Sequence, residues 1–171
     1  MLLRSLLILC LLSLAVSYPN KKFDTKYTIC PNGWMRFGDS CYYYERKKMT
    51  FDKAEVHCLQ LGGTMFVADT VQEWDMVVKQ SHINAWSWVG LKQDEDERKP
   101  RWTETGGIPM SAIKWLSGTN GWSTASNCVA YYNSDVNPYA LFYYCGLDYH
   151  PICEKNATLL ANIWDPTATG F

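Results

Sequence analysis

Residues 85–91 read AWSWVGL, an apolar run in the middle of the chain. Short runs rich in tryptophan, valine and leucine and bounded by turn formers are typical of buried β-strands. Similar runs occur on both sides of this one. The predicted strands are 40–45, 85–91, 128–132, 141–145 and 151–155.

Two helices are predicted between the first two of these strands. Thr50 is a suitable N-cap for the first, Asp52 lies in its first turn, and the glycine pair 62–63 ends it. Thr70 begins the second helix and forms a capping box with Glu73. The apolar face comprises Phe51, Ala54, Cys58, Leu59 and Leu61 in the first helix, and Trp74, Val77 and Val78 in the second.

The N-terminus predicts a secreted, extracellular protein. Arg4 precedes an apolar run over 6–12, and small residues up to Ser17 offer a signal-peptidase site. The run is shorter than the ~20 residues that span a bilayer, and no later segment is long enough, so no membrane span is expected. With 16 basic and 17 acidic residues the chain has no basic excess, which argues against a nucleic-acid partner.

Six cysteines follow the predicted signal peptide, and in a secreted chain of this size they predict three disulfides. The cysteines alone leave the pairing open. Zinc is disfavoured because no CxxC pair exists and His57, His82 and His150 are not spaced as ligands. An even set of cysteines leaves no thiol for catalysis, and we find no nucleophile–base constellation, so we do not expect an enzyme.

Taken in order, several motifs resemble those of C-type lectin-like domains. They are CPNGW at 30–34, CYY at 41–43, the helix with Ala54 and Cys58, WVGL at 88–91, Trp102, Trp115, Cys128, Cys145 and ICE at 152–154. The resemblance implies an α+β fold, with two helices flanking small antiparallel sheets and a long irregular loop region. It also implies the disulfides Cys30–Cys41, Cys58–Cys153 and Cys128–Cys145.

The resemblance divides the chain into four segments. Residues 1–17 would be the signal peptide, 18–29 an N-terminal segment, 30–155 the C-type lectin-like domain and 156–171 a C-terminal tail. The tail begins with the one glycosylation sequon, Asn156-Ala157-Thr158.

Sugar-binding members of this family hold calcium through three groups of oxygen ligands. These are a proline-containing triplet in the long loop, an acidic residue before the fourth of the six cysteines, and a Trp-Asn-Asp triplet before the fifth. The corresponding positions here hold Thr119-Asn120-Gly121, Ser126-Asn127 and Ala140-Leu141-Phe142. Calcium needs several carboxylate or carbonyl oxygens. We therefore expect no cofactor and no calcium-dependent sugar site of the usual kind.

The sequence offers two other places where calcium could bind. Asn133, Asp135 and Asn137 could supply oxygens to a rearranged site, although asparagine and aspartate also favour turns. The acidic run 94–97 could hold an auxiliary ion or form a solvated loop balanced by the basic residues after it.

The remaining candidate binding surface is the loop 118–127 together with the stretch 131–139. The candidate ligand-binding residues are Asn120, Trp122, Asn133, Asp135 and Asn137. Trp122 lies outside any apolar period, so its ring either contacts a ligand or packs under its own loop. Trp88, Trp102 and Trp115 are assigned to the core.

These features predict a secreted recognition module that binds carbohydrate or a protein ligand without the usual calcium-dependent site. The alternative is a secreted effector or inhibitor that docks a protein partner through the long loop and the tail. The glycan or extracellular protein concerned and the oligomeric state are left open by the sequence.

Overall fold

The computed structural model describes residues 28–93, 100–116 and 120–159; the predicted signal peptide lies outside these residues. They contain two α-helices, a short 3₁₀ helix at Met110–Ala112 and ten strands. The elements are β1 (Thr28–Ile29), β2 (Met35–Phe37), β3 (Ser40–Tyr44), α1 (Phe51–Gln60), β4 (Thr64–Met65), α2 (Val71–Lys79), β5 (Ala85–Lys92), β6 (Arg101–Trp102), β7 (Cys128–Asn133), β8 (Tyr139–Tyr143), β9 (His150–Asn156) and β10 (Thr158–Leu159).

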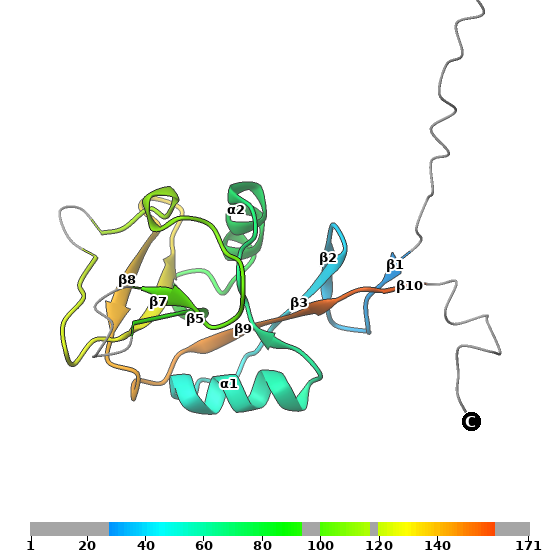
Figure 1. Ribbon diagram of the computed structural model, residues 1–171, viewed down its shortest axis with the longest axis horizontal. Coiled ribbons are helices and arrows are strands. Elements are labelled where there is room, and N and C mark those ends of the chain that lie inside the picture. Colours follow the sequence, from blue (N-terminus) through cyan, green and yellow to red (C-terminus); the bar gives the residue numbers. More distant parts are fainter. Residues whose placement is uncertain (1–27, 94–99, 117–119, 160–171) are drawn as a thin grey trace, which may run out of the picture.

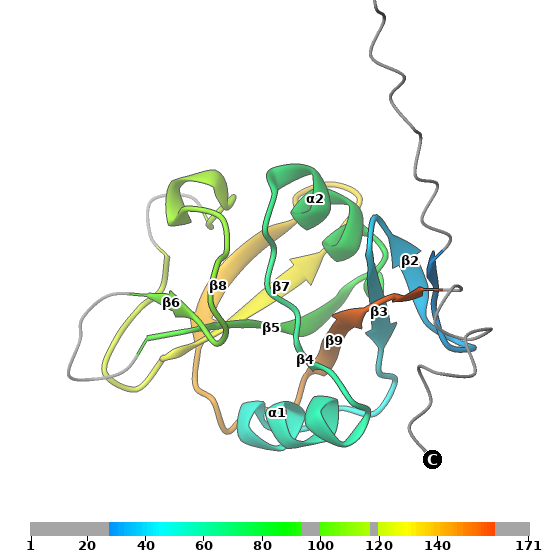
Figure 2. The same cartoon turned by 45° about the vertical axis from the view of Figure 1, so that its right-hand side comes forward.

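Eight strands form one mixed sheet, in which the order β2-β3-β9-β5-β7-β8 is extended by β4 on β9 and β6 on β5. The pairs are antiparallel except β5 with β9, which are parallel. Helices α1 and α2 lie on opposite sides of this sheet (Figures 1 and 2). The α+β class predicted from the sequence is confirmed, with a larger sheet than expected.

Strand β5 divides the interior into two cores because its side chains alternate between the faces of the sheet. Val89 and Leu91 belong to a core with α2, whereas Trp88 belongs to a core with α1. Gly90 lies between them, where a Cβ would be 2.8 Å from the Phe66 carbonyl oxygen and 2.7 Å from the Thr103 hydroxyl. This close approach explains why a glycine interrupts the apolar run.

Both predicted helices are present. Thr70 and Glu73 form the expected capping box at the start of α2. Thr50 occupies the N-cap of α1, but its side chain makes no capping hydrogen bond. The prediction for Leu59 is wrong, because its side chain is 62% exposed while Phe51, Ala54 and Cys58 face the sheet.

The strand predicted at 141–145 is displaced and lies at Tyr139–Tyr143. The reason is visible at Cys145, whose carbonyl oxygen accepts a hydrogen bond of 2.9 Å from the Phe51 N–H at the start of α1. This residue therefore ties the chain to a helix terminus instead of extending the ladder.

Three disulfides join Cys30 to Cys41, Cys58 to Cys153 and Cys128 to Cys145, as the resemblance implied. The second links α1 to β9 across 95 residues, and the third links the start of β7 to the segment after β8. A separate two-stranded ribbon pairs Thr28 with Leu159 and Ile29 with Thr158. This ribbon brings together the segments predicted to flank the domain.

Candidate functional site

The positions where the family would place its last calcium ligands are closed. Ala140 is 0% exposed and Phe142 is 2% exposed, and both belong to the core on the α2 side. The ring of Phe142 stacks on Trp115 with centroids 5.5 Å apart and planes 6° apart. This part of β8 packs the interior, and because neither side chain carries an oxygen, neither can bind calcium.

The long loop is fastened to the same strand. The Phe142 N–H donates to the Asn120 carbonyl oxygen at 2.8 Å. Gly121 follows with φ of +74°, and a Cβ there would lie 2.6 Å from Cδ1 of Leu141. The side-chain oxygen of Asn120 accepts the N–H of Trp122 at 3.2 Å. The oxygens of Asn120 therefore have partners within the chain.

Trp122 is half-buried instead of standing exposed. Its ring packs against the core on the α2 side, and its indole N–H is buried without a hydrogen-bond partner in the described part of the chain. Of the three tryptophans assigned to the core, Trp88 and Trp102 are buried as predicted, and Trp115 packs partly buried against the core on the α2 side.

Asn133, Asp135 and Asn137 do not converge on one point. Asn133 is 6% exposed, and its amide donates to the carbonyl oxygens of Lys79 and Ser81 at 3.2 and 2.8 Å, which ties β7 to the end of α2. Asn137 accepts a hydrogen bond from Lys114, while Asp135 is exposed in the turn before Pro138.

The donor set therefore does not fit the family's calcium site. The acidic run 94–97 and Thr119 lie outside the described residues. Across 28–93, 100–116 and 120–159, no three histidine, cysteine or acidic side chains are grouped so that they could hold a metal ion. The same residues contain no helix that is long and apolar enough to cross a membrane.

An unexpected surface lies on the other side of β5, β7 and β8, which we call the aromatic face. It consists of Trp86, Tyr132, Tyr139, Tyr143 and Tyr149, all partly exposed. The Trp86 ring is the centre of the group. Its centroid lies 4.7 Å from that of Tyr143, 5.0 Å from Tyr132, 5.5 Å from Tyr139 and 5.8 Å from Tyr149.

Strand register assembles the aromatic face. Trp86 lies opposite Tyr132 on the neighbouring strand, and Tyr132 lies opposite Tyr139. Cross-strand pairs of this kind bring side chains on one face into contact. Ala130 occupies the middle of the same face on β7, and its small side chain leaves room for larger neighbours. The rings therefore form one continuous layer.

The layer keeps its polar groups available. Within the part of the chain that the structure describes, neither the Trp86 indole N–H nor the four tyrosine hydroxyls have a hydrogen-bond partner, and none of these atoms is buried. Burial raises the pKa of Tyr143 to about 12, with smaller contributions from the nearby Tyr149 and Tyr139. Its hydroxyl therefore stays protonated at neutral pH and can donate as well as accept.

The sequence located only part of this surface. The stretch 131–139 contains Tyr132 and Tyr139, whereas Trp86, Tyr143 and Tyr149 were not predicted as binding residues. Alternation along β8 was the available signal. Since Ala140 and Phe142 face inward, Tyr139 and Tyr143 must face the opposite side.

The glycosylation sequon lies at the opposite end of β9 from Tyr149. Asn156 is the last residue of the strand and is exposed, as is Thr158 in β10. Both side chains that the sequon requires are therefore accessible.

Comparison with known proteins identifies this architecture. The family profile of the lectin C-type domain matches residues 47–155. C-type lectin domain-containing protein 91 of Caenorhabditis elegans is 39% identical over 144 residues, which are 77% of this chain and 64% of that protein. The chain thus spans slightly less than two thirds of this relative's length.

Two solved structures share the fold at lower identity. The C-type lectin domain of murine dendritic cell inhibitory receptor 2, in complex with N-glycan, has a TM-score of 0.67 and 22% identity over 75% of this chain and 99% of that one. A calcium-independent type II antifreeze protein has a TM-score of 0.66 and 23% identity over 77% and 98%. From the family profile and the C. elegans relative, the chain belongs to the C-type lectin domain family.

Proposed function

We propose that this chain is a secreted recognition module, without enzymatic activity, that binds a glycan on its aromatic face and does so without calcium. The observation that carries the proposal is the layer formed by Trp86 and the four tyrosine rings around it, whose indole and hydroxyl groups are accessible. The apolar signal-like segment and three disulfides support secretion, because such bonds persist in oxidising compartments.

The chemistry of the layer suits a sugar. A pyranose presents C–H groups on its faces and hydroxyls on its edge, and aromatic rings offer a negative π-face with a polar tip. Trp86 and Tyr139 would contact the C–H face, while the hydroxyls of Tyr132 and Tyr143 would reach the sugar's edge. A rigid aromatic side chain loses little entropy on binding, which favours affinity.

A protein partner that docks through the loop 118–127 and the tail remains the alternative function. It is less well supported, because Trp122 was its sharpest contact residue and packs partly into the core. Residues 117–119 and 160–171 lie outside the described residues and contribute no observation.

A glycan array in EDTA, followed by titration of the strongest binder, tests the proposal. The variants Trp86→Ala and Tyr139→Ala should each weaken binding at least ~5-fold, because each removes a ring worth more than ~1 kcal/mol at an aromatic contact. Tyr144→Ala is the matched control. Tyr144 is 62% exposed and follows the same strand, but its ring contacts none of the five.

Binding that disappears in EDTA would overturn the calcium-independent mode. If Trp86→Ala still binds the glycan, and circular dichroism shows that the variant is folded, the aromatic face is not the binding site. If no glycan binds at all, the protein-docking alternative becomes the better account.

A further inference from the structure

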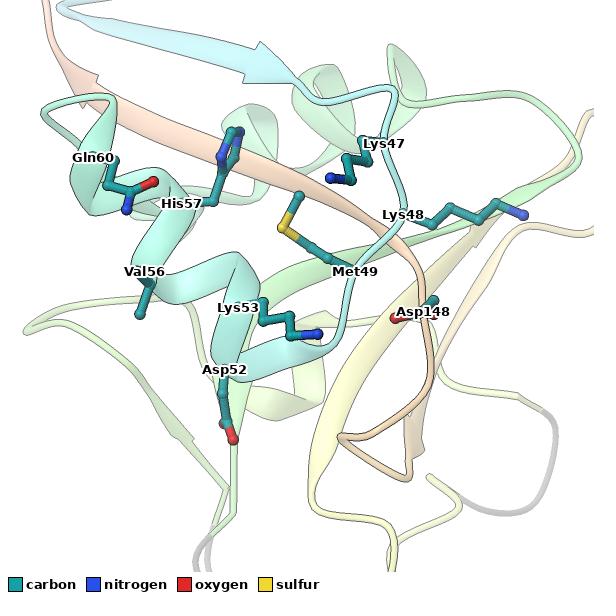
Figure 3. Close-up of a pocket in the computed structure, with 9 residues that line it drawn as sticks. All are labelled: Lys47, Lys48, Met49, Asp52, Lys53, Val56, His57, Gln60 and Asp148. Carbon is teal, nitrogen blue, oxygen red and sulfur yellow. The ribbon is translucent and has the colours of Figure 1, made fainter.

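A pocket of about 660 Å³ lies between α1 and the loop that connects β3 to α1 (Figure 3). We call it the lysine pocket. Its lining includes Lys47, Lys48, Met49, Lys53, His57 and Asp148. In Figure 3 the side chains of Lys47 and Lys53 flank Met49, while that of Lys48 extends away from them. Lysine side chains therefore lie on both sides of Met49.

Lysines outnumber aspartates in the lining of the lysine pocket, and these lysines form no ion pair with another described residue. Among the described residues, no acidic side chain lies within 4.0 Å of Nζ of Lys47, Lys48 or Lys53, because the two ion pairs found there are His57–Glu45 at 2.8 Å and Lys92–Glu55 at 3.4 Å. Asp52 and Asp148 also line the pocket, so its lining carries three lysines and two aspartates.

Glu45 lies next to the pocket, but its carboxylate is directed at His57 and at the Lys47 backbone and not at a lysine ammonium. It pairs with His57 and accepts the backbone N–H of Lys47 at 2.8 Å. Burial acts to raise the pKa of Glu45, but these hydrogen bonds outweigh it and hold the pKa below its usual value. The carboxylate is therefore charged and turned toward His57.

The lysine pocket adjoins the aromatic face. Met49, at the centre of the pocket, exchanges two backbone hydrogen bonds with Tyr149, of 2.9 and 3.0 Å. Asp148, which also lines the pocket, precedes Tyr149 in the chain. The Tyr149 ring in turn stacks on Trp86. One surface therefore offers rings at one side and ammonium groups at the other.

We infer that the glycan bound on the aromatic face is an acidic one, whose sulfate or carboxylate group is received by Lys47, Lys48 and Lys53 in the lysine pocket. This inference rests on the proposed function and names the class of glycan. Lysine is a point charge with three rotatable donors, so it suits an anion held at the rim of a site. Rings alone would not distinguish acidic from neutral sugars.

The test compares sulfated, uronate-containing and neutral glycans on one array in EDTA, and then titrates the strongest binder and its uncharged counterpart. Wild-type protein should select acidic glycans, and the array shows whether sulfate or carboxylate is preferred. The variant K47Q/K48Q/K53Q should lose at least ~10-fold in affinity for the acidic glycan and keep its affinity for the uncharged one. Raising the salt concentration should weaken the binding of the acidic glycan by the wild-type protein but not by the triple variant, because salt screens exposed charges.

Lys79→Gln is the matched control, since Lys79 is an exposed lysine of α2 on the other side of the sheet and should change affinity less than ~2-fold. Three outcomes would contradict the inference. Selection of neutral glycans alone overturns it and leaves the proposed function standing. Acidic binding that survives the triple substitution places the anion elsewhere. Absence of any glycan binding overturns both proposals.

Discussion

The two sides of β8 show how one strand can close one site and open another. On the α2 side, Ala140 and Phe142 fill the place where related lectins carry calcium ligands, and the loop at Asn120 is hydrogen-bonded over them. On the other side, Tyr139 and Tyr143 extend a layer of aromatic rings. The alternation of a strand therefore links the two outcomes, because the same residues set both faces.

Truncating a side chain on the α2 side of β8 should have the largest effect on stability. Phe142→Ala should lower the free energy of unfolding by about 3–5 kcal/mol, because it removes a buried ring stacked on Trp115. Tyr139→Ala, on the aromatic face of the same strand, should lower the free energy of unfolding by about 1 kcal/mol because the Tyr139 ring is only partly buried. Urea denaturation of both variants measures the contrast. Equal costs would show that the two sides are packed alike.

Removing the disulfide between Cys128 and Cys145 should have the next largest effect. The double variant Cys128→Ala/Cys145→Ala should lose about 3 kcal/mol, the value expected for a loop of this length. The aromatic face should survive, because the β7–β8 ladder keeps Tyr132 opposite Tyr139. Denaturation gives the first quantity, and glycan affinity of the folded variant gives the second. A loss of binding without unfolding would mean that the disulfide itself orders the rings.

A smaller effect distinguishes structural from ligand-binding roles in the β7–β8 turn. Asn133→Ala should cost about 1–3 kcal/mol, because it leaves the carbonyl oxygens of Lys79 and Ser81 without this donor. Asp135→Asn should leave stability within ~0.5 kcal/mol, since Asp135 is an exposed turn residue. Thermal unfolding of both proteins is the measurement. If Asn133→Ala is as stable as wild type but binds ligand more weakly, Asn133 would be assigned to the binding site.

Calcium should have the smallest effect of all. The melting temperature of the disulfide-bonded protein should be the same in 10 mM calcium and in EDTA, because Ala140, Leu141 and Phe142 supply no side-chain oxygen. A site of ~0.1 mM affinity would instead add about 2–3 kcal/mol. Such a shift would indicate ligands elsewhere, and carboxylate substitutions in the run 94–97 would be the next experiment.

Local patterns predicted most of the elements but little of what joins them. The capping box at Thr70 and the apolar run at 85–91 act over a few residues, so their outcome is visible in the sequence. The hydrogen bonds of Asn133 to Lys79 and Ser81 join residues more than 50 positions apart. No local signal separates such a buried donor from a turn former.

The aromatic face illustrates the same limit. Each ring lies in a predicted strand or beside one, but contact between Trp86 and Tyr143 depends on the register across β7 and on the small Ala130 between them. Register is a property of paired strands and not of either strand alone. The family's missing calcium ligands were visible in the sequence, whereas the surface that we propose in their place required the fold.

The ribbon of β1 and β10 has a consequence for how the domain can be displayed. Both ends of the described chain leave from this ribbon, at the end of the molecule opposite β7 and β8 (Figure 1). A tether attached to either end would therefore start at the end of the molecule away from β7 and β8, which carry part of the aromatic face. Several copies held on one support by such tethers could engage a repetitive polymer together, and their avidity would then depend on tether length more than on any single contact.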